Sequence, residues 1–238
     1  MRGLFVTATD TGVGKTVLSA ALLAAMAAAG EPVRAFKPVV TGLEDPQEIA
    51  ARGDWPADHE LLAATAGMPA EEVSPKRYGP AVSPHLAAEL AGEPIEPEQL
   101  LAAAVGAEGN AGHAPRRTLI VEGVGGLLVP LREDYSVCDF AAALGLPVLI
   151  AARPGLGTIS HTLLTLRVAR DAGLEVRAVV LTPWPQEPTV LERSNRETIA
   201  SIGEVEIQTL PEIPNPQLAE LARAGGSLPW RRWLGPDA

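Results

Sequence analysis

Cysteine and lysine are both scarce in this sequence, and aromatic residues make up only 4% of it. Among the 238 residues the single cysteine is Cys138, which excludes an intramolecular disulfide and any multi-cysteine metal site. One unpaired thiol fits a reducing cytoplasm, where we expect the protein to work. Of the 19 basic residues, the only lysines are Lys15, Lys37 and Lys76. Because lysines are so few, their positions are informative.

The sequence also lacks a basic run and a long hydrophobic segment. Its net charge is −10 and its isoelectric point is near 4.9, so its surface does not favour a phosphate backbone. An apolar stretch at residues 17–29 is rich in alanine, follows a Lys-Thr pair and is too short to span a bilayer. We therefore expect small-molecule ligands, with no nucleic acid and no membrane as partners.

Hydrophobic residues make up 47% of the chain, enough for a sizeable core in one domain. Short apolar runs predict strands at residues 4–7, 33–37, 118–122, 148–152, 176–181 and 205–210. Most of these runs do not alternate with polar residues, which is typical of strands buried on both faces. Helical patterns at residues 16–29, 159–172 and 189–201 supply the covering layers. The sequence thus predicts a single-domain α/β fold, a doubly wound and mostly parallel sheet with helices on both faces.

Two regions depart from this alternation within the single domain expected over residues 1–238. Residues 42–117 hold short Ala-rich helical pieces interrupted by prolines, and we interpret them as an excursion that builds over the active site. In the C-terminal region helical character is confined to residues 217–224, so we expect residues 226–238 to form a loosely ordered tail.

A phosphate-binding loop is predicted at residues 7–16, between the first strand and a helix. In this position the backbone N–H groups and the helix N-terminus can face phosphate. Gly12 and Gly14 let the main chain curve around an anion, Lys15 neutralises the β- and γ-phosphates, and the Thr16 hydroxyl can bind Mg²⁺. Thr9 stands where the strict pattern has glycine.

Two spaced motifs resemble the dethiobiotin synthetase family: TDTGVGKT at residues 9–16 and KPVVTG at residues 37–42. The resemblance continues in SPH at residues 83–85, VEGVGG at 121–126 and GLGTISHT at 155–162, in the family's order. It covers most of the chain to about residue 182 and weakens afterwards. The resemblance implies a P-loop enzyme that uses ATP and Mg²⁺.

In that family, an amine of diaminopelargonic acid captures CO₂ as a carbamate, ATP phosphorylates the carbamate, and the second amine displaces phosphate to close a ureido ring. The resemblance implies that Lys37 contacts the carbamate and the transferring phosphoryl group, together with Lys15 and Thr11 as catalytic residues. It also implies that Thr41 hydrogen-bonds the substrate. Anionic reactants approach each other only with cations between them, which the two lysines and Mg²⁺ would supply.

The metal set implied by the resemblance is Thr16, Glu122 and an aspartate after Thr41. Glu122 ends an apolar strand, where a carboxylate can hold Mg²⁺. Asp54 and Asp58 compete for the third place. We choose Asp58 because it begins a helical stretch as the family aspartate does, although a carboxylate there is also an ordinary helix cap.

The remaining site residues come from the same resemblance. The nucleotide-binding positions are Gly12, Val13, Gly14, Lys15, Thr16, Val17, Asp58, Glu122, Gly123, Val124, Gly125, Thr182, Pro183, Pro214 and Asn215. The positions that receive the distal carboxylate, often from the neighbouring subunit of a homodimer, are Gly157, Thr158 and Ser160. Thr182 and Pro183 stand where the family has an Asn-containing element that reads the adenine, so the preference between ATP, CTP and other nucleotides stays open, and Trp184 either stacks on the base or covers apolar surface.

Two other functions share the phosphate loop. A nucleotide-switch ATPase would carry a second lysine before the glycines, where this chain has Asp10. A small-molecule kinase would stop at a stable phosphorylated product. The motifs around Lys37 and Thr41 weigh against the first, and the elements at Glu122 and at residues 155–157 match a synthetase better than the second.

Overall fold

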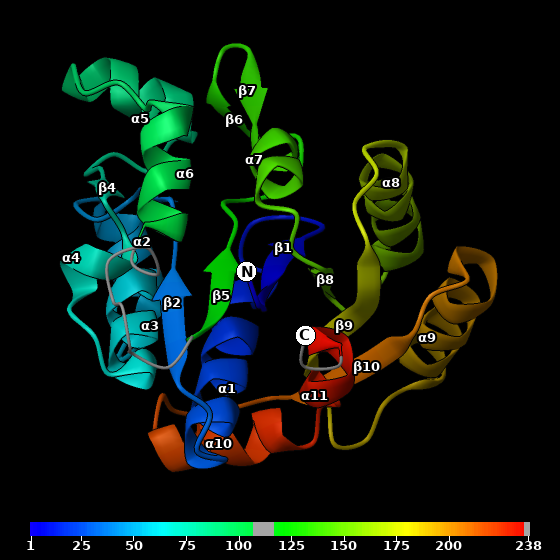
Figure 1. The fold of residues 1–238 in the computed structure, drawn as a ribbon. Helices are drawn as coiled ribbons and strands as arrows, with labels where there is room; N and C mark the ends of the chain where they lie inside the picture. Colours follow the sequence, from blue (N-terminus) through cyan, green and yellow to red (C-terminus); the bar gives the residue numbers. More distant parts are fainter. Residues whose placement is uncertain (107–116, 236–238) are drawn as a thin grey trace.

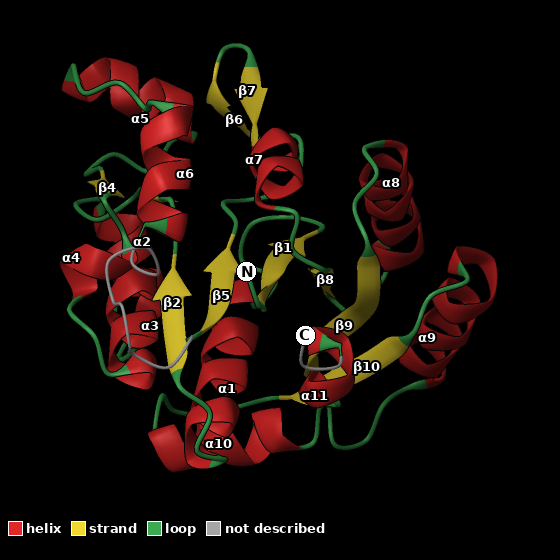
Figure 2. Ribbon diagram, viewed as in Figure 1, coloured by secondary structure: helices red, strands yellow, loops and turns green. Residues whose placement is uncertain are grey.

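The computed structural model describes residues 1–106 and 117–235, and its centre is a six-stranded sheet in which every pair of neighbours is parallel. The strand order is β10-β9-β8-β1-β5-β2, so that β5 and β2 lie on one side of β1 and β8, β9 and β10 lie on the other (Figure 1). Helices cover both faces of the sheet (Figure 2). The predicted fold class is confirmed.

The strands of the large sheet are β1 (Gly3–Ala8), β2 (Val33–Phe36), β5 (Thr118–Glu122), β8 (Val148–Ala152), β9 (Val176–Trp184) and β10 (Ile207–Pro211). Two small ribbons are formed by β3 (Val39–Val40) with β4 (Lys76–Arg77), and by β6 (Pro130–Arg132) with β7 (Tyr135–Ser136). The helices are α1 (Lys15–Ala28), α2 (Pro46–Arg52), α3 (Asp58–Ala66), α4 (Ala70–Val73), α5 (Pro84–Ala91), α6 (Pro97–Val105), α7 (Val137–Leu144), α8 (Thr158–Asp171), α9 (Val190–Gly203), α10 (Leu218–Gly226) and α11 (Trp230–Leu234).

The central strands are buried on both faces because their side chains point alternately into two separate cores. Leu4 and Val6 of β1 belong to the core under α1, α3 and α10, whereas Phe5 belongs to the core under α6, α7, α8 and α9. All six residues of β1 are buried, which explains the continuous apolar run seen in the sequence. The two small ribbons have strands of two or three residues, too short to show a periodic pattern.

The order of the strands places the functional region. The chain passes from β1 to β2 at one edge and returns to β5, and it then crosses β1 to reach β8 on the other side, so its direction across the sheet reverses beside β1. Ligands of open α/β sheets bind at such a switch point, beyond the carboxyl ends of the strands. The segment between β3 and β5 contributes α2 to α6 as far as residue 106, and residues 107–116 of the expected excursion lie outside the described residues.

The C-terminal segment differs from the loosely ordered tail expected over residues 226–238. Helix α10 runs along α1, and Gly225 lets the two backbones approach closely, since an added Cβ would lie 2.0 Å from the Ala21 carbonyl oxygen. Helix α11 then buries Trp230 and Trp233, the latter 1% exposed, in the core that contains α1. The sequence shows no helical pattern in this segment, because it is short and contains prolines. Burial of the two indole rings nevertheless stabilises it. Residues 236–238 lie outside the described residues.

Among the described residues, no helix combines the length and the apolar character needed to cross a bilayer.

Candidate active site

The phosphate loop occupies the turn between β1 and α1, at the switch point of the sheet. Gly12 and Gly14 adopt left-handed backbone angles, with φ of 68° and 95°. Gly14 is the N-cap of α1 and has no side chain, so no side-chain cap bonds the N–H groups of the first turn. Its missing Cβ also matters for packing, because that atom would lie 3.0 Å from Thr182 Cγ2. The N-terminus of α1 can therefore receive an anion.

Lys15 is held inside this loop. Its ammonium group donates a hydrogen bond to the Asp10 carbonyl oxygen at 3.0 Å, and the residue is 7% exposed. Burial, and then repulsion by Lys37, lower the pKa of Lys15 to about 8. A phosphate group would favour the charged form of this lysine, so the loop is electrostatically suited to an anionic ligand.

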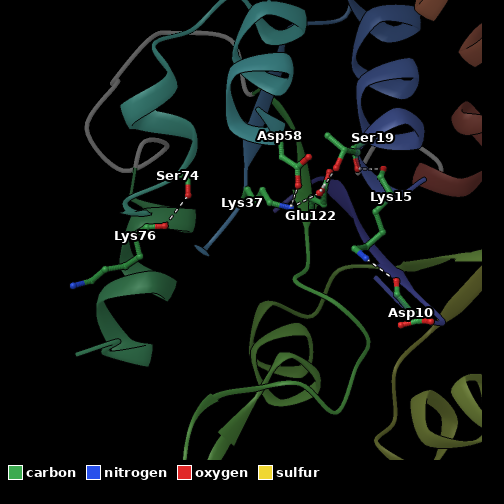
Figure 3. Close-up of polar contacts among 9 residues, drawn as sticks. Asp10, Lys15, Ser19, Lys37, Asp58, Ser74, Lys76 and Glu122 are labelled. Carbon is green, nitrogen blue, oxygen red and sulfur yellow. Dashed lines mark hydrogen bonds and ion pairs between the residues drawn. The ribbon is translucent and has the colours of Figure 1, made fainter. Parts of the chain in front are cut away.

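Lys37 lies at the end of β2 between two carboxylates. Its ammonium group is 3.0 Å from Asp58 Oδ2 and also forms an ion pair with Glu122 Oε1 (Figure 3). Burial alone would lower the pKa of Lys37, but the attraction of Asp58 and Glu122 outweighs burial and raises it. Burial would likewise raise the pKa of Asp58, and the charge of Lys37 with hydrogen bonds from Lys37 and Thr16 lowers it instead. These pKa shifts keep both Lys37 and Asp58 charged at neutral pH.

The oxygen atoms around Thr16 suit a magnesium ion. The Thr16 hydroxyl donates to Glu122 Oε1 at 2.9 Å, while Glu122 Oε2 is buried and has no hydrogen-bond partner among the described residues. Hydroxyl and carboxylate oxygens are the donors that Mg²⁺ prefers, with phosphate and water completing its shell. Since no cluster of three or more His, Cys, Asp or Glu side chains occurs in the described part of the chain, a metal here would depend on nucleotide phosphates.

A cavity of about 700 Å³ opens beside the phosphate loop and Lys37. Eleven of the predicted site residues line it: Thr11, Gly12, Gly14, Lys15, Thr16, Val17, Lys37, Thr41, Asp58, Val124 and Gly125. Glu122 lies behind this wall, fully buried, and contacts the cavity residues Thr16 and Lys37. Side chains from β1, β2, β5 and the excursion are thus brought together although they are far apart in the sequence.

Asp58, and not its competitor Asp54, contacts Lys37 in the structure. Asp58 is the first residue of α3 and lies at the cavity wall, whereas Asp54 is exposed in the preceding loop and does not line the cavity. Ala57 is the N-cap residue of α3, and its backbone N–H donates a hydrogen bond to the Glu60 carboxylate at 2.9 Å. The Asp58 carboxylate is therefore free to face Lys37.

Other predicted residues do not line this cavity. Val13 is packed in the core, and Gly123 lies against Phe5 and Val137. Thr182 is buried behind Gly14 and is joined to Pro183 by a cis peptide bond. The expected base-reading residues Pro214 and Asn215 follow β10, and the expected carboxylate-binding residues Gly157, Thr158 and Ser160 form the start of α8.

Several residues of the site carried no signal in the sequence. Arg153 follows β8 and donates a hydrogen bond to the Thr11 carbonyl oxygen at 3.1 Å, which ties the phosphate loop to the next strand. Arg52, the last residue of α2, and Trp55, in the loop that follows, also line the cavity. No motif or periodicity marks these positions, because each contact depends on how distant loops pack. Ser83 and Pro84 also line the cavity, in a segment that the family motif SPH had marked.

Comparison with solved structures supports the fold. The cell division ATPase MinD of Pyrococcus furiosus covers 94% of this chain and 98% of its own, with a TM-score of 0.53 and 16% identity. A ParA family ATPase from Chlorobium tepidum covers 95% of this chain and 91% of its own, with a TM-score of 0.52 and 14% identity. At such identities the similarity extends to the P-loop architecture alone.

Sequence comparison identifies the family. A family model described as an AAA domain matches residues 2–222. The ATP-dependent dethiobiotin synthetase of Anaeromyxobacter dehalogenans is 40% identical over 231 residues, 96% of this chain and 97% of its own. That of Bacillus subtilis strain 168 is 34% identical over 218 residues, 90% of this chain and 89% of its own. The resemblance of the motifs is thereby confirmed over nearly the whole length, and the chain belongs to the ATP-dependent dethiobiotin synthetase family.

Proposed function

We propose that this chain is an ATP-dependent ligase of biotin biosynthesis that converts 7,8-diaminopelargonic acid, CO₂ and ATP to dethiobiotin, ADP and phosphate. The observation that supports it best is the position of Lys37. Its ammonium group is held by Asp58 and Glu122 at the wall of a cavity that the phosphate loop also lines. A cation fixed between the sites for two anionic reactants is what carbamate phosphorylation requires.

The reaction has three steps. One amine nitrogen of the substrate attacks the carbon of CO₂ and loses a proton, which gives a carbamate. A carbamate oxygen then attacks the γ-phosphorus of ATP, and ADP leaves. The second amine attacks the carbonyl carbon of the mixed anhydride, the C–N bond closes the five-membered ring, and phosphate leaves with the bonding electron pair. The protein contributes mainly position and charge to these steps.

Each predicted residue has a role in this scheme. Lys15 and the N–H groups of Gly12 to Val17 bind the β- and γ-phosphates, and Thr11 hydrogen-bonds the phosphates from the other side of the loop. Lys37 binds the carbamate oxygen and the transferring phosphoryl group, and Thr41 hydrogen-bonds the substrate. These residues share one cavity wall, which supports the assignment.

Thr16, Asp58 and Glu122 would hold Mg²⁺, which when bound neutralises negative charge on the nucleotide phosphates. The unpartnered Glu122 Oε2 and the adjacent Thr16 hydroxyl support this part of the proposal. Because Asp58 and Glu122 also hold Lys37 in place, the same carboxylates serve both cations.

We further propose that the enzyme acts in the cytoplasm as a homodimer, in which Gly157, Thr158 and Ser160 of one subunit receive the distal carboxylate of substrate bound by the other. Leu156, in the loop before α8, is 91% exposed, so this loop is accessible to a second subunit. On the nucleotide side, Pro183, Pro214 and Asn215 would contact the base, with ATP as the first choice.

The test is phosphate release by the purified protein with diaminopelargonic acid, bicarbonate, Mg²⁺ and ATP, repeated with CTP and GTP. We expect release to require the diamine and dethiobiotin to form in equal amount. ATP hydrolysis that is indifferent to the diamine would reject the synthetase and favour a switch ATPase, and a stable phosphorylated product without ring closure would favour a kinase.

A further inference from the structure

A second cavity, of about 440 Å³, lies on the outer side of the loop between α2 and α3. It shares the wall formed by Arg52, Trp55 and Pro56 with the first cavity, but Lys15 and Lys37 do not line it. The motifs of the sequence do not include its lining. The residues that form it are Leu43, Ile49, Arg52, Gly53, Trp55, Pro56, Ala57, His59, Glu60 and Arg77.

Two of the residues that line the cavity, Arg52 and Arg77, are cations without an ion-pair partner in the described part of the chain. Neither Arg52 nor Arg77 forms an ion pair with a carboxylate among the residues that the structure describes, whereas Arg132, Arg167 and Arg223 do. The carboxylate that lines the cavity, that of Glu60, already accepts the N–H of Ala57. In a protein of net charge −10, an uncompensated pair of guanidinium groups beside a concave surface favours an anion.

His59 provides a second, independent observation. The residue lines the cavity and is only 5% exposed, yet its Nδ1 atom is buried without a hydrogen-bond partner. A buried polar atom that lacks a protein partner usually bonds to a water molecule or a ligand. The unsatisfied imidazole therefore marks the same place as the two guanidinium groups.

The rest of the wall is apolar. Leu43, Ile49, Trp55 and Pro56 line it together with the polar groups. A hydrated inorganic anion would gain nothing from this surface, whereas a short hydrocarbon chain would be removed from water on it. The cavity lining thus offers contacts both to an anionic head and to an apolar chain.

We propose that this second cavity binds a small carboxylate that carries a short apolar chain, with its head on Arg77 and Arg52 and its chain along Trp55. A carboxylate matches the planar guanidinium group and can accept two N–H donors at once. The neighbouring His59 contributes a further polar contact. This site does not depend on the proposed function, because the phosphate loop takes no part in it.

The experiment uses the full chain saturated with ADP and Mg²⁺, so that the first cavity's phosphate site is occupied. Sodium hexanoate is titrated at constant ionic strength while the side-chain NMR signals of His59 and Trp55 are followed. For a ligand of this size we expect saturable shifts with a dissociation constant on the order of 1 mM. Hexylamine, with the same chain and the opposite charge, and inorganic phosphate, with no chain, are the matched probes.

Arg77→Ala is the decisive variant, since Arg77 lines the second cavity and not the first. We expect hexanoate affinity to fall about tenfold in Arg77→Ala and less in Arg77→Lys, which retains the charge. Arg223→Ala, on α10, is the control and should bind as the unchanged protein does. Unfolding temperature and ATP-dependent turnover establish that each variant is folded.

Several outcomes would overturn the proposal. The absence of saturable shifts, equal hexanoate binding by the protein and its Arg77→Ala variant, or equal binding of hexylamine would each show that no carboxylate site exists here. Phosphate that displaces hexanoate and binds more tightly would reject the carboxylate in favour of a phosphate group.

Discussion

Two regions of the site differ in how much of their structure a single chain provides. One is the phosphate end, and the other is the region expected to bind the base and the distal carboxylate. At the phosphate end, Lys15, Lys37, Asp58 and Glu122 already contact one another or adjacent atoms before any ligand binds. At the other end, Gly157 and Ser160 at the start of α8 are exposed, and the residues after β10 do not line the cavity. Charged groups must be fixed in advance to stabilise charge, whereas contacts to a base or a carboxylate tail can form upon assembly.

The sharpest test of this difference is Lys37→Ala. We expect turnover to fall about 10³-fold, because a fixed cation at the transferring phosphoryl group is lost while the phosphate loop stays intact. Nucleotide affinity, measured by calorimetry, should change little. Lys76→Ala is the matched control, since this third lysine points away from the cluster (Figure 3) and should leave turnover unchanged. Near-normal turnover in Lys37→Ala would remove Lys37 from the mechanism.

Glu122→Gln tests the shared carboxylate. We expect the Mg²⁺ concentration for half-maximal activity to rise about 10- to 100-fold, because the amide is a weaker metal donor. The same change leaves Lys37 with one carboxylate and should lower the free energy of unfolding by about 3 kcal/mol. Measurement of turnover against Mg²⁺, with denaturant unfolding in parallel, separates the two effects. An unchanged Mg²⁺ titration would exclude Glu122 as a ligand.

The pair Asp58→Asn and Asp54→Asn compares two carboxylates four residues apart. Asp58 holds Lys37 at 3.0 Å, so its loss should lower turnover about tenfold or more, whereas Asp54→Asn should have little effect. Steady-state kinetics at saturating ATP and diamine provides the comparison. Equal losses, or a larger loss for Asp54, would assign the metal aspartate to the other position.

The pH dependence of nucleotide binding tests Lys15. Its pKa in the nucleotide-free protein is about 8, while phosphate favours the ammonium form, so binding above pH 8 must take up a proton. Affinity for ADP should then fall by up to about tenfold per pH unit above that value. The stability of the fold changes with pH in the opposite direction. Between pH 8 and the ordinary lysine pKa of 10.5 the unfolded chain binds more protons than the folded chain, so the contribution of Lys15 makes the nucleotide-free protein more stable as pH rises through this window. Calorimetry in buffers of different ionisation enthalpy measures the uptake, and Lys15→Gln should abolish it.

The smallest effect on activity is expected for the residues proposed to contact the nucleotide base. Asn215→Ala should raise the KM for ATP about threefold with kcat unchanged, as expected for loss of one neutral hydrogen bond. The side chain also accepts the N–H of Gln217 at 3.2 Å, so a matched Gln217→Ala variant, which keeps that backbone contact, controls for the loop. A fall in kcat, or an equal effect on ATP and CTP, would show that Asn215 does not read the base.

Much of the phosphate end could be predicted because short motifs coincide with strand ends. Lys37 follows the buried strand β2 and Glu122 ends the buried strand β5, and parallel strands bring their carboxyl ends to one edge. The choice between Asp54 and Asp58 was weaker, since both lie in one loop and only packing decides which faces Lys37. The contact of Arg153 with Thr11 needs the pairing of β8 with β1, which no local pattern encodes. The packing of α11 is not predictable from the sequence, because it depends on the burial of two tryptophans that show no helical periodicity.

The C-terminal helix α11 bears on how the family diverges. The family model ends at residue 222, yet Trp230 and Trp233 lie beyond that limit and fill the core beside the helix that follows the phosphate loop. Such a segment is held by buried apolar volume more than by particular residues, so apolar replacements of similar volume should cost little there. A segment outside the limits of a family model can thus still support the helix that begins at the phosphate loop.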